Sequence, residues 1–216
     1  MTYTGHVTPA GPAAVHELPR LVITKVSVGP MDNNAYLLRC RRTDEQVLID
    51  AANEADRLVS LVGDDGLGAI VTTHQHADHW QALKAVRAAT RARTYAHALD
   101  ADGIPVETDV FLEDGDVLRF GACEVSLIHL AGHTPGGLAL VYDDPEGAPH
   151  LFTGDSLFPG GVGKTTPETF PQLFADVTKK IFDRLPDETW VYPGHGNDTT
   201  LGIERPHLAE WQARGW

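Results

Sequence analysis

Four side chains that can bind a metal ion lie within six consecutive residues, namely His74, His76, Asp78 and His79. Imidazole is the commonest transition-metal ligand at neutral pH, and a carboxylate beside it suits a borderline cation such as zinc. The cluster directly follows an apolar run at residues 68–73. Ligands this close in sequence indicate a loop at the end of a strand, where side chains can converge from different directions. The hexapeptide therefore predicts a metal site.

Three later segments each place one more potential ligand just after a strand-like run. These ligands are His133, Asp155 and His195, and a glycine precedes each of them. Glycine permits tight backbone bends, and a strand end holds a side chain on a rigid scaffold while leaving room for a substrate. Together with the first cluster, the ligands are too many for one tetrahedral ion and enough for two.

The remaining histidines lack this glycine-bordered setting. We expect three of them to face solvent, namely His6, His16 and His207. The other three should lie on or beside strands outside the site, namely His97, His129 and His150. Ser156, next to Asp155, is interpreted as a turn hydroxyl and not as a nucleophile. The sequence therefore gives no Ser-His-Asp arrangement.

Short strands and a few helices must position these ligands. Strand-like runs rich in β-branched and apolar residues are expected at 21–28, 35–40, 46–50, 69–73, 94–97, 117–120, 124–129, 138–142, 151–153 and 190–192, and helices at 54–62, 80–91, 168–185 and 205–214. Asp32-Asn33-Asn34 is interpreted as a turn. Trp211 and Trp216 are expected to anchor the last helix on the core. The order predicts one α/β domain with a mixed sheet system and outer helices over residues 20–216, after an irregular lead-in at residues 1–19.

The composition excludes several classes of function. The chain has 216 residues, of which 42% are hydrophobic, and its net charge is -13 because 30 acidic residues outnumber 17 basic ones. This balance argues against an extended nucleic-acid footprint and against a basic membrane-surface helix. The sequence contains no apolar run of about 18 residues and no signal-type apolar region near its start. Cys40 and Cys123 are expected to be free thiols, and the protein is expected to be cytoplasmic, with a small-molecule substrate as its partner.

The ligand series resembles that of the metallo-β-lactamase superfamily, from about Leu21 onward. The HxHxDH motif at 74–79 is specific to that family when His, Asp and His follow in this order. The resemblance implies a four-layer αββα sandwich (an α/β, or α+β, fold). It implies one ion held by His74, His76 and His133, a second held by Asp78, His79 and His195, and Asp155 bridging both. Asp50 matches the family's early aspartate, which orients the ligand loop.

The implied chemistry is hydrolysis. Two divalent ions, zinc first and iron or manganese as alternatives, lie about 3.5–4 Å apart in such sites and turn a water into hydroxide at neutral pH. That hydroxide attacks a carbonyl carbon, and Asp78 and Asp155 can orient it. Residues 73–79, 131–136 and 153–158 are most similar to glyoxalase II (hydroxyacylglutathione hydrolase) and its short bacterial relatives. A small thioester or related ester is therefore the expected substrate.

Substrate recognition is where the chain departs from glyoxalase II. Lys164 matches a substrate-contacting lysine, whose ammonium could hold a carboxylate, although a solvated loop lysine is the alternative reading. The family's two recognition tyrosines correspond to Thr166 and Asn197, and the sequence ends 21 residues after His195, without the helical domain that completes the glutathione pocket. We expect Lys164 and Asn197 to contact the thioester of another low-molecular-weight thiol, or a small ester.

Two other reactions are compatible with the same ligands. Persulfide dioxygenases share the fold but use one iron, which His74, His133 and Asp155 would hold here. That branch usually carries an arginine-containing loop where this chain has Val162-Gly163-Lys164. Lactonases keep the aspartate at the Asp155 position, whereas β-lactamases commonly have cysteine there, so lactone hydrolysis is the third candidate.

Overall fold

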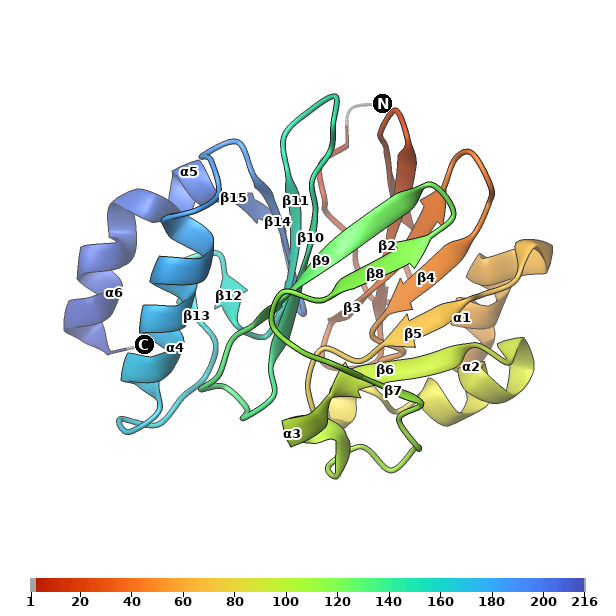
Figure 1. Ribbon diagram of the computed structural model, residues 1–216, viewed down its shortest axis with the longest axis horizontal. Helices are drawn as coiled ribbons and strands as arrows, with labels where there is room; N and C mark the ends of the chain where they lie inside the picture. Colours follow the sequence, from red (N-terminus) through yellow and green to blue (C-terminus); the bar gives the residue numbers. More distant parts are fainter. Residues whose placement is uncertain (1–2, 216) are drawn as a thin grey trace.

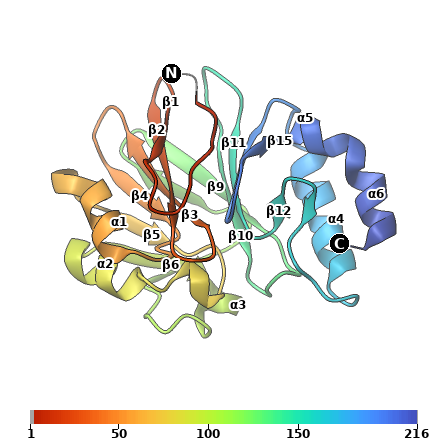
Figure 2. The same ribbon diagram turned by 180° about the vertical axis from the view of Figure 1, so that it is seen from behind.

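Two β-sheets lie face to face at the centre of the molecule, with helices on both outer faces (Figure 1), in a computed structural model that describes residues 3–215. Helices α1 and α2 cover one sheet, and helices α4, α5 and α6 cover the other, which is equally clear from behind (Figure 2). The expected four-layer αββα sandwich is confirmed.

The first sheet takes its strands from residues 14–112 in sequence order. They are β1 Ala14–Glu17, β2 Leu21–Val28, β3 Asn33–Cys40, β4 Gln46–Ile49, β5 Ala69–Val71, β6 Arg93–His97 and β7 Val110–Leu112. Strands β1 to β4 are antiparallel, and β4 to β7 are parallel. Parallel neighbours need crossover connections, and these contain α1 (Ala55–Val62), α2 (Leu83–Thr90) and α3 (Ala98–Ala101).

The second sheet takes its strands from residues 117–200. In spatial order they are β15 Thr199–Thr200, β14 Trp190–Pro193, β11 His150–Gly154, β10 Leu138–Tyr142, β9 Cys123–His129 and β8 Val117–Phe120. Helix α4 (Phe170–Asp176) continues as a π-helix over Val177–Phe182, and α5 (Leu201–Glu204) and α6 (Leu208–Arg214) follow. Strands β12 (Leu157–Phe158) and β13 (Gly161–Val162) form a small separate ribbon.

Alternation along the strands divides the apolar residues among three cores. In β3, Tyr36 and Leu38 point into the core between the sheets, where Phe152 and Tyr192 of the second sheet meet them. Their neighbours in β3 instead join the core beneath α1 and α2. A third core lies between the second sheet and the C-terminal helices. Successive side chains of a strand point to opposite faces, so each sheet is apolar on both sides.

Most expected elements are found within a few residues, and three expectations need correction. Residues 14–17 of the supposedly irregular lead-in form β1, which pairs with β2. Asn33 and Asn34 are not a turn but the first residues of β3, and they are buried. The last helix begins at Leu208 and not at Arg205, because residues 205–207 form a 3-10 turn.

The C-terminal helix is anchored as expected. Trp211 of α6 is buried and packs edge-on against Phe182 of the π-helix. Trp216 and residues 1–2 lie outside the described residues. No helix among residues 3–215 is long and apolar enough to cross a membrane.

Candidate metal centre

The loops that carry the predicted ligands all leave the carboxyl end of a strand. In the second sheet β11 and β14 are parallel, and β9 runs in the same direction because both β9 and β11 are antiparallel to β10. Their carboxyl ends therefore share one edge of the sheet, where the loops with His133, Asp155 and His195 begin. The loop after β5 brings residues 74–79 to the same place from the first sheet.

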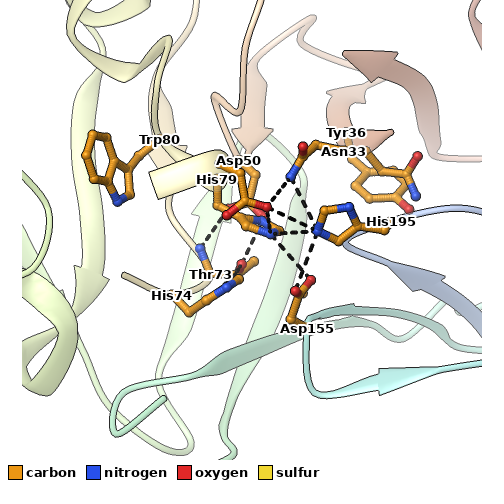
Figure 3. Close-up of polar contacts among 12 residues, drawn as sticks. Asn33, Tyr36, Asp50, Thr73, His74, His79, Trp80, Asp155 and His195 are labelled. Atoms are coloured by element: carbon orange, nitrogen blue, oxygen red, sulfur yellow. Dashed lines mark hydrogen bonds and ion pairs between the residues drawn. The ribbon is translucent and has the colours of Figure 1, made fainter. Parts of the chain in front are cut away.

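All seven predicted ligands converge there. Three groups have ligand atoms within 4.8 Å of one another: His74 with His76 and His133, His74 with His79 and Asp155, and Asp78 with His79 and His195. Asp155 lies between the first and third groups. Its Oδ1 is 3.4 Å from His79 Nε2, and its Oδ2 is 3.6 Å from His133 Nε2 and 3.5 Å from His195 Nε2. Figure 3 shows Asp155 and His195 facing His79 across the centre.

Four of the five imidazoles use Nδ1 for an anchoring contact. His133 Nδ1 donates to the Lys164 carbonyl at 2.7 Å, and His195 Nδ1 donates to the Met31 carbonyl at 2.9 Å. Because a carbonyl can only accept, the proton of each neutral ring lies on Nδ1 and the lone pair lies on Nε2. Such an outer hydrogen bond is what orients a metal-binding histidine.

Asp50, at the end of β4, anchors the remaining pair as the sequence analysis expected. Its Oδ2 accepts from His79 Nδ1 and from Thr73 Oγ1, both at 2.8 Å, while its Oδ1 accepts from the Thr73 backbone N–H. The Thr73 hydroxyl gives its proton to Asp50, so it accepts from His74 Nδ1 at 3.1 Å. Asp50 thus fixes both rings through one carboxylate (Figure 3).

Three of the atoms that face the centre lack hydrogen-bond partners among residues 3–215. His74 Nε2, His133 Nε2 and Asp155 Oδ1 are buried and make no hydrogen bond. Leaving a buried acceptor unpaired costs about 1–3 kcal/mol, and more for a charged group. Three such atoms at one point, with their rings already anchored from behind, fit divalent metal ions.

The charges around the first histidine group point the same way, whereas at His79 burial is outweighed by the Asp50 and Asp155 carboxylates, which raise its pKa to about 10. Burial, and then the nearby His79, lower the pKa of His74, and burial also lowers the pKa of His133. Burial alone would raise the pKa of Asp155, but the close imidazoles of His195 and His79 bring it below its usual range. The centre therefore holds an ionised carboxylate beside two neutral imidazoles, which are the protonation states that metal binding requires.

Strand β3 contributes residues that sequence reasoning missed. Asn33 Nδ2 donates to Asp78 Oδ2 at 2.9 Å and lies 3.4 Å from His195 Nε2. Asn34 Nδ2 donates to the carbonyls of Pro193 and Gly196, and the Tyr36 hydroxyl also donates to Pro193. The sequence shows Asn33 and Asn34 directly before an apolar run. That pattern is compatible with the start of a strand as well as with a turn.

The glycines before the ligands serve two purposes, although a bend was expected at each. Gly132 and Gly154 have positive φ values of 138° and 47°, as a bend requires. Gly194 has no such angle. A Cβ atom there would lie 2.8 Å from His79 Cε1 and closer still to Asp155 Oδ1. Gly194 is therefore required for space beside the ligands.

A cleft of about 600 Å³ opens beside the first histidine group. Its lining includes His76, His133, Lys164 and Thr166. Lys164 is exposed there, as a substrate-contacting ammonium would be. Asn197 is exposed but does not line this cleft within residues 3–215, and its Oδ1 pairs with His6 Nδ1 at 3.0 Å.

The other histidines lie away from the centre. His97 stacks on His129 with ring centroids 4.1 Å apart, and His16 and His150 both contact the Tyr192 hydroxyl. His207 is on the outer helices beside Glu210. Within the described residues none of them belongs to a group of potential ligands.

Comparison with known proteins agrees with this architecture. A family model described as the metallo-beta-lactamase superfamily matches residues 28–195. A hydroxyacylglutathione hydrolase from Cereibacter sphaeroides is 36% identical over 166 residues, which is 76% of this chain and 62% of that protein. The chain thus spans less than two thirds of the length of that relative.

Two solved structures are also similar. ETHE1 from Myxococcus xanthus has a TM-score of 0.77 and 28% identity over 88% of this chain and 84% of its own. The protein TTHA1623, crystallised in a di-iron-bound form, has a TM-score of 0.69 and 35% identity over 84% of this chain and 96% of its own. The described fold therefore recurs in proteins of known structure.

Proposed function

Because this chain belongs to the metallo-β-lactamase superfamily, we propose that it is a hydrolase that uses two divalent metal ions to cleave a small thioester. One ion would be held by His74, His76 and His133. The second would be held by Asp78, His79 and His195, with Asp155 shared between the two. The observation that carries this proposal is the convergence of seven potential ligands, three of which have a buried central atom without a hydrogen-bond partner. The di-iron form of TTHA1623 supports a pair of ions.

The protein's own residues would prepare the site and hold the substrate. Divalent ions, when bound, would make water acidic enough to act as a nucleophile at neutral pH and would polarise a carbonyl group. Asp78 and Asp155 accept hydrogen bonds and would orient that nucleophile. Asn33 holds Asp78 in place. Zinc is the proposed ion, and iron or manganese suit the same ligands.

The cleft beside His76 and His133 would receive the substrate. Lys164 lines it and would hold a carboxylate of the thiol portion, while the thioester carbonyl lies toward the ligands. The relatives named hydroxyacylglutathione hydrolase support a thioester. Thr166 takes the place of a tyrosine that would contact glutathione, so we propose a different low-molecular-weight thiol as the carrier.

A second candidate is an oxygenase with one iron. Among the candidate ligands, the buried atoms without a hydrogen-bond partner belong to His74, His133 and Asp155, which is a two-histidine, one-carboxylate set. Here the third group, with Asp78, His79 and His195, favours a second ion.

Metal quantification on the purified protein, combined with a substrate panel, separates the candidates. The panel contains thioesters of several thiols, lactones and a glutathione persulfide, and oxygen uptake is recorded. We expect two ions per chain and thioester hydrolysis. A chelator should remove the ions and abolish the hydrolysis. One iron per chain with oxygen consumption would contradict the hydrolase proposal.

A further inference from the structure

Asp100 is a buried carboxylate that no step of the proposed reaction uses. It lies in the short helix α3, and its exposed fraction is 0%. A carboxylate is rarely buried completely unless its oxygens are paired. The partners of Asp100 therefore indicate what it does.

Each oxygen of Asp100 accepts a hydrogen bond from a different ligand loop. Oδ2 accepts from the backbone N–H of Gln75 at 2.9 Å, and Oδ1 accepts from the backbone N–H of Gly136 at 2.7 Å. Gln75 lies between His74 and His76, and Gly136 lies three residues after His133. One carboxylate thus connects the loop after β5 with the loop after β9.

The surroundings hold this connection rigid. The Trp80 indole N–H donates to the Gln75 carbonyl at 2.7 Å, so the peptide groups on both sides of Gln75 are fixed. Gly136 packs directly on α3, since a Cβ atom at this position would lie 2.8 Å from Asp100 N and 2.9 Å from its Cγ. The two loops come from different sheets, and within residues 3–215 no strand pairing connects them. Beside them, the Leu138 N–H donates to the Thr73 carbonyl at 2.9 Å, and Asp100 adds the contact at Gln75 and Gly136.

We propose that Asp100 is a positioning residue that holds the loop of His74 and His76 against the loop of His133, so that the three imidazoles form one metal site. This inference rests on the proposed function, because it takes these histidines as ligands of one ion. Residues outside the ligand set commonly change metal affinity by about 10–100-fold when they are replaced. The second ion, at Asp78, His79 and His195, has its own supports in Asp50, Asn33 and Met31.

Asp100→Asn tests this with little change of shape. An amide offers one acceptor and one donor group, so one of the two backbone N–H groups would face a donor. Asp144→Asn is the matched control, because Asp144 is also buried and accepts a backbone N–H, from Glu146, in the distant β10–β11 loop. Gly136→Ala is a second variant, which disturbs the same contact from the other loop and serves if Asp100→Asn does not fold.

Two measurements are made on each variant. In metal-free protein, amide hydrogen exchange should be faster at Gln75 and Gly136 in Asp100→Asn than in the wild type. Titration with Co²⁺ against a competing chelator, followed by its visible absorption, should show one of the two ions bound about 10–100-fold more weakly and the other nearly unchanged. Gly136→Ala should give the same pattern, and Asp144→Asn should give the wild-type result.

The outcomes distinguish the two proposals. Unchanged exchange at both amides, or unchanged Co²⁺ affinities in a folded Asp100→Asn protein, would overturn the role of Asp100 and leave the hydrolase proposal standing. An equal loss in Asp144→Asn would also overturn it, because the effect would then be general. If the wild type binds no pair of ions, the proposed function fails, and the exchange measurement still decides whether Asp100 connects the loops.

Discussion

The five imidazoles of the centre differ in how the protein holds them. His74, His79, His133 and His195 each use Nδ1 for an anchoring contact, whereas His76 is exposed and its ring has no hydrogen bond to any described residue. Replacing His76 therefore disturbs the scaffold least. It is the most direct site at which to test the ligand set.

His76→Ala should reduce the metal content from two ions per chain toward one. Thioester hydrolysis should fall by about 100-fold or more, as when a group that stabilises a transition state is removed. Metal quantification and initial rates measure both, and His207→Ala, an exposed histidine on the outer helices, is the control. Unchanged hydrolysis in His76→Ala would exclude the binuclear mechanism.

Lys164→Ala should raise KM about 2- to 5-fold with little change in kcat, because an exposed ion pair contributes about 0.2–1 kcal/mol and acts equally on ground and transition states. Lys179→Ala, an exposed lysine of the π-helix, should leave both constants unchanged. Steady-state kinetics on a carboxylate-bearing thioester measures the effect. A fall in kcat alone would show that Lys164 is not a binding residue of this kind.

The ligands and Asp50 were predictable from sequence, and the other supports were not. The candidate ligands are few and chemically distinctive, and three of them follow a glycine, so their spacing together with the family resemblance picked out all seven. Asn33 and Asp100 are ordinary polar residues whose importance comes from the atoms they face across long sequence separations. Asn197 was expected to contact the substrate, but its side chain pairs with His6. That contact depends on where the N-terminal segment lies, which local sequence patterns do not predict.

At the scale of elements, a buried ion pair holds the segment after β14. Lys25 of β2 is 0% exposed and donates from Nζ to Asp198 Oδ1 and to the carbonyls of Gly5 and Gly196, at 2.6–2.8 Å. Burial lowers the pKa of Lys25 and raises the pKa of Asp198. The residue after His195 is thus tied to the first sheet and to the N-terminal segment.

Lys25→Met should destabilise the fold by about 3–5 kcal/mol, because it leaves the Asp198 carboxylate buried without its cation. The double variant Lys25→Met, Asp198→Leu should be less destabilised than the sum of the single variants, since it leaves no charge behind. Urea unfolding measures all four proteins of this cycle. Additive losses would show that the two residues do not act as a pair.

Elements were predicted best where one pattern decides them. Strand β2 and helix α1 lie within a residue of their expected bounds. Strand β2 is rich in β-branched residues and is followed by Gly29, and the helical periodicity of α1 is uninterrupted until Gly63 ends the helix. Strand β1 was missed because prolines and glycines surround it and its partner strand stabilises it. Helix α3 is only four residues long, too short for any periodicity to show.

At the scale of the whole molecule, a histidine cluster between the sheets affects acid stability. His150 of β11 and His16 of β1 both contact the Tyr192 hydroxyl at 2.9 Å. Burial, and then the proximity of His16, lower the pKa of His150 to about 4. An unfolded histidine titrates near 6.5, so between these values the unfolded chain binds more protons than the native one.

The free energy of unfolding should therefore be unaffected by protonation of His150 above about pH 6.5. It should fall by up to about 3 kcal/mol as the pH falls toward 4, because the unfolded histidine gains its proton first. Urea unfolding of chelator-treated protein at pH 7.5 and pH 4.5 measures this loss. His150→Gln should reduce the difference between the two pH values, and His207→Gln should not. An unchanged difference in His150→Gln would assign the acid sensitivity to other groups.

The division of the ligands between the sheets has a consequence for how the molecule could be taken apart. The first sheet ends at residue 112 and the second begins at residue 117, so the exposed turn between them separates the chain into two contiguous halves. Each proposed ion takes ligands from both halves, and neither half alone completes a site. Two fragments cut at this turn would bind metal tightly only after they recombine. Metal binding would therefore measure how far the two fragments have reassembled.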